Sequence, residues 1–241
     1  MIRVKDLTVR FGGVTPLDHM TVDFDEGTCG LIGPNGAGKT TFFNVLSGFV
    51  RPAEGSVTAF DEDLLSMAHY RRARWGLRRT FQTEQSIEDL TLYENVLMVH
   101  EHSSKETTGS RDEDVLGAIK FVGLNASPYA KVGTLGAAER RLVEIARAVV
   151  GKPRVVLLDE PAAGLPDEET ERMGRVIKKI PDEIGARVIL VDHDMSLVSA
   201  CCSKTSVLDF GELIASGSTA DVLRNEQVKQ AYLGVDAEAV A

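Results

Sequence analysis

The order of hydrophobic and polar residues along this chain predicts both strands and helices. Alternating apolar and polar residues predict N-terminal strands at Ile2 to Phe11 and Met20 to Phe24. Continuous β-branched and apolar runs predict buried strands at 154–158 and 187–191. Helical periodicity predicts a helix from Ala137 to Val150. This succession of buried strands and helices is typical of an α/β fold.

The rest of the sequence completes a single predicted domain that spans residues 1–241. The pattern predicts further strands at Gly55 to Phe60, 205–209 and 212–216, a helix ending at Gly48, a helix opening at Pro166 and another from Met195 to Cys202. From about 84 to 135 the sequence becomes charged and helical, and its polar stretch from Glu101 to Asp114 predicts a flexible loop. We therefore expect a core of residues 1–83 and 136–241 with a helical subdomain at about 84–135.

The octapeptide from Gly33 to Thr40 reads Gly-Pro-Asn-Gly-Ala-Gly-Lys-Thr and lies between an apolar strand and a helical run. This spacing is the pattern of a loop that binds the phosphates of a nucleoside triphosphate. Its glycines let successive backbone N–H groups turn toward an anion, and the following helix N-terminus favours negative charge. Lys39 supplies a positive charge for the β- and γ-phosphates, and the Thr40 hydroxyl is suited to bind Mg²⁺.

Two carboxylates, Asp159 and Glu160, follow directly after the buried run at 154–158. Parallel strands deliver such groups to the carboxyl edge of a sheet, where ligands bind. We expect Asp159 to hold Mg²⁺, directly or through water, and Glu160 to act as the general base that polarises the attacking water. The two roles are assigned to neighbours because adjacent residues on a strand point to opposite sides.

Three further segments follow in a fixed order around these motifs. Arg79-Thr80-Phe81-Gln82 precedes the helical region, Leu135 to Ala148 precedes the acidic strand, and Val188 to Asp194 follows it. Over nearly the whole chain, this order resembles the ATP-binding-cassette (ABC) ATPases. Within that superfamily the chain is most similar to the ATPase subunits of branched-chain amino-acid importers, on five segments: Arg10 to Gly13, Asn44 to Phe49, Arg79 to Gln82, Ala163 to Leu165 and Ala231 to Gly234.

The resemblance implies a fold with an ABC ATPase core, in which a mixed sheet is flanked by helices, together with an antiparallel β edge and a helical subdomain. It implies that Phe11 stacks on adenine; the alternative is an ordinary core aromatic, because stacking cannot be read from sequence. Gln82 would touch Mg²⁺ or the attacking water and sense the membrane partner, and His193 would hydrogen-bond the γ-phosphate. The phosphates would be wrapped by the backbone of Asn35, Gly36, Ala37, Gly38, Lys39, Thr40 and Thr41.

One segment departs from the family pattern. Where ABC ATPases carry Leu-Ser-Gly-Gly-Gln, this chain reads Leu135-Gly136-Ala137-Ala138-Glu139. In the family this signature segment begins a helix and offers a serine hydroxyl and backbone N–H groups to the ATP of the opposite subunit. Gly136, Ala137 and Ala138 are therefore candidate nucleotide contacts. Gly136 brings no hydroxyl, which loses roughly 1.5–3 kcal/mol of hydrogen bonding, and an alanine at a position needing φ > 0 would add strain of about 1 kcal/mol.

Charge and composition restrict the partners. A net charge of −9 disfavours nucleic acid as a partner, because nucleic-acid-binding domains usually carry basic surfaces. No apolar run approaches the roughly 18 residues that span a bilayer, so a membrane connection would require another chain. The three cysteines have no metal-ligand spacing, and we expect buried free thiols. One basic cluster could be solvated or could face lipid headgroups or an acidic coupling segment: Arg71, Arg72, Arg74, Arg78 and Arg79.

We therefore expect an ATP-hydrolysing subunit, with ATP and Mg²⁺ as cofactors, peripheral at the cytoplasmic face of the inner membrane beneath transmembrane permease subunits. Branched-chain or related amino acids would be imported. The alternatives are the ATPase of a lipid or lipopolysaccharide exporter and a regulatory subunit that hydrolyses ATP poorly. A soluble ABC protein of DNA repair or translation would carry a coiled-coil insertion or a second cassette. Because the phosphate loop is complete and the signature segment is not, we expect a heterodimer with a second ABC ATPase subunit rather than a homodimer.

Overall fold

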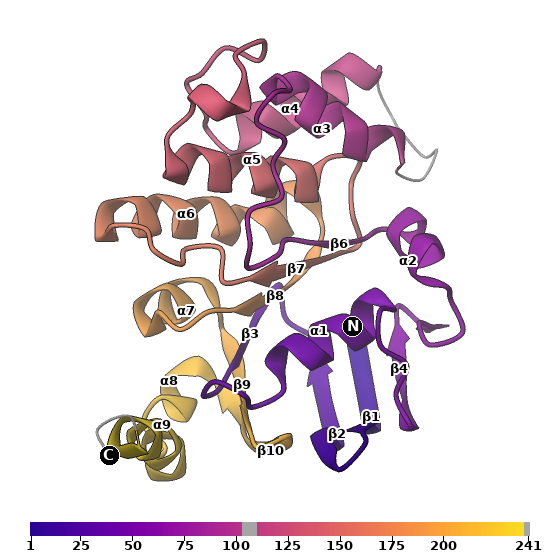
Figure 1. The fold of residues 1–241 in the computed structure, drawn as a ribbon, viewed down its shortest axis with the longest axis vertical. Coiled ribbons are helices and arrows are strands. Elements are labelled where there is room, and N and C mark those ends of the chain that lie inside the picture. The colour runs from indigo at the N-terminus through magenta and orange to yellow at the C-terminus, as the bar shows by residue number, and fades with distance from the viewer. Residues whose placement is uncertain (103–109, 239–241) are drawn as a thin grey trace. The chain divides into compact units, whose positions relative to one another are not determined.

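The computed structural model describes residues 1–102 and 110–238, with the side chains described through Tyr232. The chain forms two compact units: unit 1 consists of Met1–Arg72 and Ile189–Ala241, and unit 2 of Ala73–Val188 (Figure 1). Two elements, α2 (His69–Trp75) and β8 (Arg187–Val191), cross the boundaries between these units. The expected helical subdomain at about 84–135 lies within unit 2, and its limits as a domain stay a prediction.

Unit 1 contains a four-stranded antiparallel sheet in the order β2-β1-β4-β5. Its strands are β1 (Ile2–Phe11), β2 (Val14–Phe24), β4 (Glu54–Ala59) and β5 (Glu62–Asp63). The alternation that predicted β1 buries Ile2 and Val4 while their neighbours are exposed. The strand expected at Met20 to Phe24 begins earlier, because Phe11 pairs with Val14 across a tight hairpin. The hairpin pairs β2 antiparallel with β1, and the resulting sheet is the predicted antiparallel β edge.

Unit 1 also contains strands in the order β10-β9-β3-β8, where β3 (Thr28–Ile32) runs parallel to β9 (Lys204–Asp209) and β10 (Glu212–Ser218) runs antiparallel to β9. This confirms the predicted mixed sheet. All five residues of β3 are buried, as the apolar run requires. Helix α1 (Lys39–Ser47) follows β3 and packs on β2, where the rings of Phe24 and Phe42 stack 5.7 Å apart. The other helices of this unit are α7 (Met195–Cys201), α8 (Thr219–Val222) and α9 (Glu226–Glu238).

Unit 2 pairs two parallel strands, β6 (Leu77–Arg79) and β7 (Val155–Asp159), with Arg79 opposite Leu157. Every residue of β7 is buried, which confirms the predicted buried strand. Helices α3 (Leu92–Glu101), α4 (Arg111–Phe121) and α5 (Ala137–Val149) pack on one another, and α6 (Asp167–Lys179) follows β7. A 3-10 turn occupies Val132–Thr134, and a π-helical turn occupies Ile180–Ile184. Of the predicted loop between Glu101 and Asp114, residues 103–109 lie outside the described residues, and α4 already begins at Arg111.

The basic cluster is partly structural rather than solvated. Arg72 is buried, and its guanidinium donates to the carbonyl oxygens of Val45 and Leu46 at the end of α1 and to that of Met67. Arg78 is also buried and donates to the carbonyl oxygen of Ala73. The long aliphatic stems reach inward while the charged ends satisfy carbonyl groups that a helix terminus leaves open. Within the cluster, Arg71 and Arg74 are exposed.

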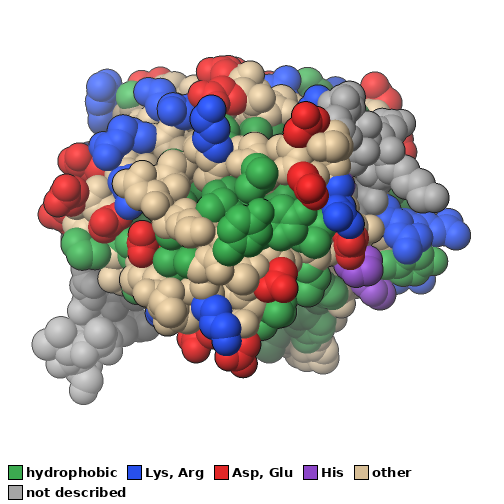
Figure 2. Space-filling view, turned by 90° about the horizontal axis from the view of Figure 1, so that it is seen from above, with side chains coloured by type: hydrophobic (Ala, Val, Ile, Leu, Met, Phe, Trp, Pro, Cys, Tyr) green, Lys and Arg blue, Asp and Glu red, His purple; other side chains and the backbone are tan. Residues whose placement is uncertain are grey.

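Two smaller expectations are tested by the fold. Cys29, Cys201 and Cys202 are buried and free, as predicted. No helix within the described residues is both long and apolar enough to cross a bilayer. Figure 2 shows hydrophobic side chains gathered near the middle of one face of the molecule, with acidic and basic side chains around them.

Candidate functional site

The phosphate loop is held in shape by two close backbone approaches in unit 1. Gly33 has φ +151°, and a Cβ there would lie 2.1 Å from the carbonyl oxygen of Leu208. At Gly38, with φ +108°, a Cβ would lie 2.2 Å from the carbonyl oxygen of Pro16. Only glycine fits both places, because any side chain would overlap a backbone oxygen and demand an unfavourable backbone conformation.

The loop opens directly into α1, and no side chain caps the N-terminus of that helix. Lys39, the first helical residue, is buried, and its ammonium donates to the carbonyl oxygens of Gly33 at 2.6 Å and Pro34 at 2.8 Å. Asn35, Gly36 and Thr40 are exposed at the mouth of the loop. Uncapped N–H groups, the helix dipole and a lysine charge together favour an anion there.

Phe11 and His193 also belong to unit 1. The Phe11 side chain is 53% exposed at the end of β1, so it is not a core aromatic, and its ring is available for stacking. His193 is exposed in the short turn between β8 and α7. The next residue, Asp194, accepts from the N–H groups of Ser196 at 2.8 Å and Leu197 at 3.1 Å and so caps α7. That cap fixes the turn in which His193 lies.

Unit 2 brings together Gln82 and both predicted acids. The Gln82 amide donates to the Glu160 carboxylate, with 2.9 Å between Nε2 and Oε2. Asp159 is nearly buried and pairs with Arg79, with 2.8 Å between Oδ2 and Nη2. The backbone N–H of Asp159 donates to the Thr80 hydroxyl at 3.1 Å. The segment Arg79-Thr80-Phe81-Gln82 therefore holds the two acids through three different side chains.

Glu160 lies one residue beyond the end of β7, and its φ is +50°. This left-handed turn, rather than the alternation of a strand, sets the direction of its side chain. A non-glycine residue in this conformation costs roughly 1–3 kcal/mol and persists only where its surroundings impose it. The hydrogen bond from Gln82 is one such restraint on the carboxylate. From the sequence, Asp159 and Glu160 were expected to point to opposite sides of one strand. In the structure Glu160 lies beyond the strand, and the left-handed turn sets its direction instead.

The signature segment begins α5 without strain. Ala137 and Ala138 are ordinary helical residues, and neither has a positive φ, so the strain considered above is absent. Gly136 is the N-cap in an extended conformation, and its N–H donates to the Glu139 carboxylate at 3.1 Å. A Cβ on Gly136 would approach only that carboxylate, at 3.8 Å. A serine would fit there.

Sequence reasoning named Arg79, Thr80 and Tyr232 within motif segments but missed the structural environment of each. Arg79 was noted in the basic cluster and in the segment Arg79 to Gln82, but its ion pair with Asp159 was not predicted, because β6 is too short to be recognised from alternation. The Tyr232 hydroxyl is buried. Burial raises the pKa of Tyr232 to about 12, and an interaction with the backbone of Gly33 opposes that rise. In the sequence, Tyr232 was noted only within the segment Ala231 to Gly234 that carries the family resemblance.

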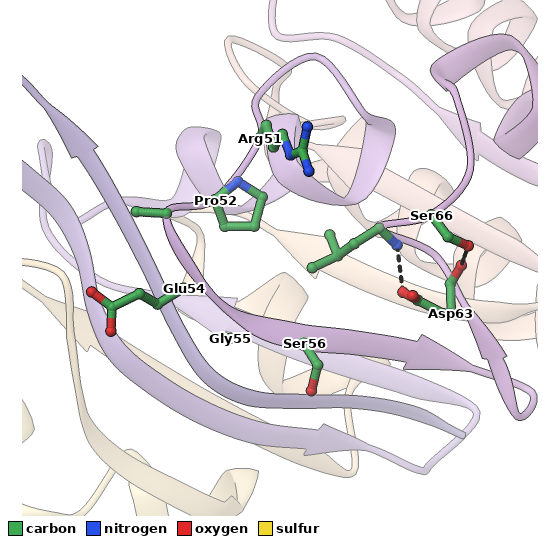
Figure 3. A pocket seen from close by; sticks show the side chains of 9 residues that line it. Arg51, Pro52, Glu54, Gly55, Ser56, Asp63 and Ser66 are labelled. Carbon is green, nitrogen blue, oxygen red and sulfur yellow. Dashed lines mark hydrogen bonds between the residues drawn. The ribbon is translucent and has the colours of Figure 1, made fainter.

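A pocket of about 390 Å³ in unit 1 lies apart from these residues. Its lining comes from the start of β4 and from the turn after β5 (Figure 3). Both of its carboxylates are already paired: Asp63 accepts from the N–H of Leu65 at 2.8 Å, and Glu54 pairs with Arg10 at 2.8 Å. None of its lining residues belongs to the phosphate loop.

Comparisons with known proteins agree with this geometry. The family model described as ABC transporter matches residues 17–163, and the model described as branched-chain amino acid ATP-binding cassette transporter matches residues 212–238. The chain belongs to the ABC transporter family. It is 33% identical to the high-affinity branched-chain amino acid transport ATP-binding protein BraF of Pseudomonas aeruginosa, over 97% of this chain and 98% of BraF.

Two further relatives of this ABC ATPase extend the comparison. The lipopolysaccharide export system ATP-binding protein LptB of Escherichia coli strain K12 is 32% identical, over 98% of both chains. The solved ADP conformation of MJ1267, an ATP-binding cassette of an ABC transporter, superposes with a TM-score of 0.86 at 27% identity, covering 97% of this chain and 98% of that one. The chain is thus an ATP-binding, ATP-hydrolysing subunit of a transporter, with the ABC ATPase fold.

The ion pair of this ABC ATPase allows a first prediction. Removing one member of a buried pair leaves an uncompensated charge, so Arg79→Met should lower the free energy of unfolding by about 3–5 kcal/mol in denaturant titrations without nucleotide. Adding Asp159→Asn should restore most of that loss, because no charge then stays buried alone. If the double variant is as unstable as the sum of the two single variants, the pair does not hold these strands together.

Proposed function

We propose that this ABC ATPase powers the import of branched-chain or related amino acids. The observation that carries the proposal is the match of residues 212–238 to a model specific to branched-chain amino acid cassettes, supported by the likeness to BraF over nearly the whole chain. Lipopolysaccharide or lipid export is the second candidate, because LptB is almost equally similar. ATP hydrolysis stimulated by a binding protein loaded with leucine, in vesicles holding the complete complex, would support import; stimulation by lipopolysaccharide alone would contradict it.

The nucleotide would bind at the phosphate loop. Backbone N–H groups from Asn35 to Thr41 and the α1 dipole stabilise its phosphates, and Phe11 stacks on the base. The oxygen donors Thr40, Gln82 and Asp159 suit Mg²⁺, which prefers hard oxygen ligands and would neutralise phosphate charge when bound. Lys39, which donates to two loop carbonyls, can transfer those hydrogen bonds to phosphate oxygens.

Glu160 would act as the general base for hydrolysis. Its carboxylate is aimed by the Gln82 amide, so a change in the Gln82 segment alters the base directly. His193 would donate to the γ-phosphate from the turn before α7. In this scheme Gln82 reports on the membrane partner and adjusts Glu160 in response.

The partner at this segment would be a transmembrane permease, which places the subunit at the cytoplasmic face of the inner membrane. Phe81, 37% exposed, and Ile87, 39% exposed, flank Gln82. Exposed apolar side chains beside a functional loop are typical of a surface that contacts another protein. No basic surface for nucleic acid is needed in this assignment.

Glu160→Gln gives the second prediction. The substitution keeps the size and the hydrogen-bonding capacity of the side chain but removes its basicity. Turnover of the complete complex should therefore fall by about 10² or more, with ATP affinity unchanged. Lys39→Ala should instead weaken nucleotide binding, measured by titration calorimetry. Normal hydrolysis by the Glu160→Gln complex would show that another group acts as the base.

The third prediction concerns the signature segment. The segment at α5 would face the ATP of the opposite subunit. Restoring Ser at 136 and Gly at 137 and 138 should raise hydrolysis in that opposite site by up to ten- to hundredfold, the equivalent of one charge-assisted hydrogen bond. The added serine fits without a clash, so ATP affinity of the isolated subunit should barely change. Unchanged turnover in a folded, dimeric complex would mean that Gly136 and the alanines work as well as the usual residues.

The fourth prediction concerns subunit composition. A complete phosphate loop and an altered signature segment in one chain favour pairing with a second ABC ATPase whose signature segment is standard. This chain would then hold ATP in a fully equipped composite site. Mass spectrometry of the complex purified at native expression levels should find one copy of this chain and one of another ATPase. Two copies of this chain and no second ATPase would contradict the heterodimer.

A further inference from the structure

Helix α5 contacts the segment after β6 through a row of charged side chains. Arg141, Glu144 and Arg147 are spaced three residues apart and therefore lie along one face of the helix. Arg141 Nη2 donates to the backbone oxygen of Gln82 at 3.2 Å. Glu144 Oε1 accepts from the N–H of Gln85 at 2.5 Å, and Arg147 Nη1 donates to the carbonyl oxygen of the same residue. These side chains thus hold the segment from Gln82 to Gln85 at both ends, through hydrogen bonds to its backbone.

The carboxylate at the centre of this row is buried. Glu144 is 6% exposed, and its Oε2 accepts from Arg141 Nη1 at 3.3 Å. Burial raises the pKa of Glu144, and the Gln85 N–H and Arg141 oppose that rise. Burying a charge costs free energy, so an apolar contact could hold a loop against a helix with a smaller free-energy cost. A row of charged side chains around one buried carboxylate instead specifies one position of the loop.

A neighbouring arginine holds the same segment from outside. Arg140 pairs with Glu84 at 2.9 Å, and it also donates to the carbonyl oxygen of Leu135 at 2.8 Å. Residues on α5 therefore bind the backbone or side chains of three of the four residues from Gln82 to Gln85. Toward the acids, the Gln82 amide donates to Glu160.

We propose that Arg141 is a positioning residue for ATP hydrolysis: together with Glu144 and Arg147 it fixes the backbone at Gln82, and Gln82 in turn aims the Glu160 carboxylate. The proposal rests on the proposed role of Glu160 as general base. It assigns to the helix that begins with the signature segment a second task, which is to hold the segment that aims the base of its own subunit. A hydrogen bond from a charged donor is strong enough to set this alignment.

The experiment measures steady-state hydrolysis by the complete complex carrying Arg141→Met. The methionine fills similar volume but cannot donate to the Gln82 carbonyl oxygen, so kcat should fall about tenfold. KM and the ATP affinity of the isolated subunit should stay within about twofold, because the contacts of Arg141 described above hold the Gln82 segment and the proposal gives Arg141 no part in binding the nucleotide. Arg141→Lys should recover most of the rate, since an ammonium can still donate to that oxygen. The matched control is Arg175→Met, which removes an exposed ion pair with Glu171 on α6 and should change nothing.

A double-mutant cycle separates positioning from general destabilisation. In a Gln82→Ala background, Arg141→Met should cause no further loss of kcat, because the amide through which it acts is gone. Additive losses, or failure of Arg141→Lys to recover the rate, would overturn the proposal. If Arg141→Met folds poorly, Glu144→Gln serves instead, since it keeps an acceptor for Gln85 but loses the charge that pairs with Arg141. A slow Glu160→Gln complex beside a fully active Arg141→Met complex would refute only the positioning role; a normal Glu160→Gln complex would refute the general base itself.

Discussion

The buried ion pair between Arg79 and Asp159 is the interaction on which the arrangement of Gln82 and the two acids in unit 2 depends. It joins the ends of two parallel strands, β6 and β7, at the point where the chain turns into the segment bearing Gln82. Asp159 is nearly buried, so its charge is tolerable only with a partner. Thr80 adds a hydrogen bond to the backbone of Asp159. With these restraints in place, the Gln82 amide reaches Glu160.

A second constraint is steric and sets the shape of the phosphate loop in unit 1. The loop from Gly33 to Gly38 passes so close to neighbouring carbonyl oxygens that a side chain at either end would overlap them. This contact fixes the loop before any ligand arrives, and α1 starts with its N–H groups uncapped. Arg72 closes the opposite end of that helix by donating to the carbonyl oxygens of Val45 and Leu46. Preorganised N–H groups bind an anion with little loss of conformational freedom.

The parts of the structure that the sequence predicted are those encoded by local patterns. Strand β1, the buried strand β7 and the helix from Ala137 follow from periodicity, and the phosphate loop follows from glycine spacing. Contacts between distant segments were not predictable: Arg79 meets Asp159 across 80 positions, and its strand has three residues. The burial of Arg72 could not be predicted either, because the sequence does not show whether an arginine side chain faces water or the end of a helix.

The altered signature segment shows that the effect of a changed residue depends on the backbone conformation at its position. Glycine at position 136 preserves the extended N-cap conformation, and the Glu139 carboxylate accepts from its N–H, so α5 begins in the ordinary way. The alanines at 137 and 138 are good helix formers, and they leave the backbone N–H groups pointing outward. What the chain lacks is one hydroxyl. Because the same helix carries Arg141, Glu144 and Arg147, its intact start preserves the support of the Gln82 segment.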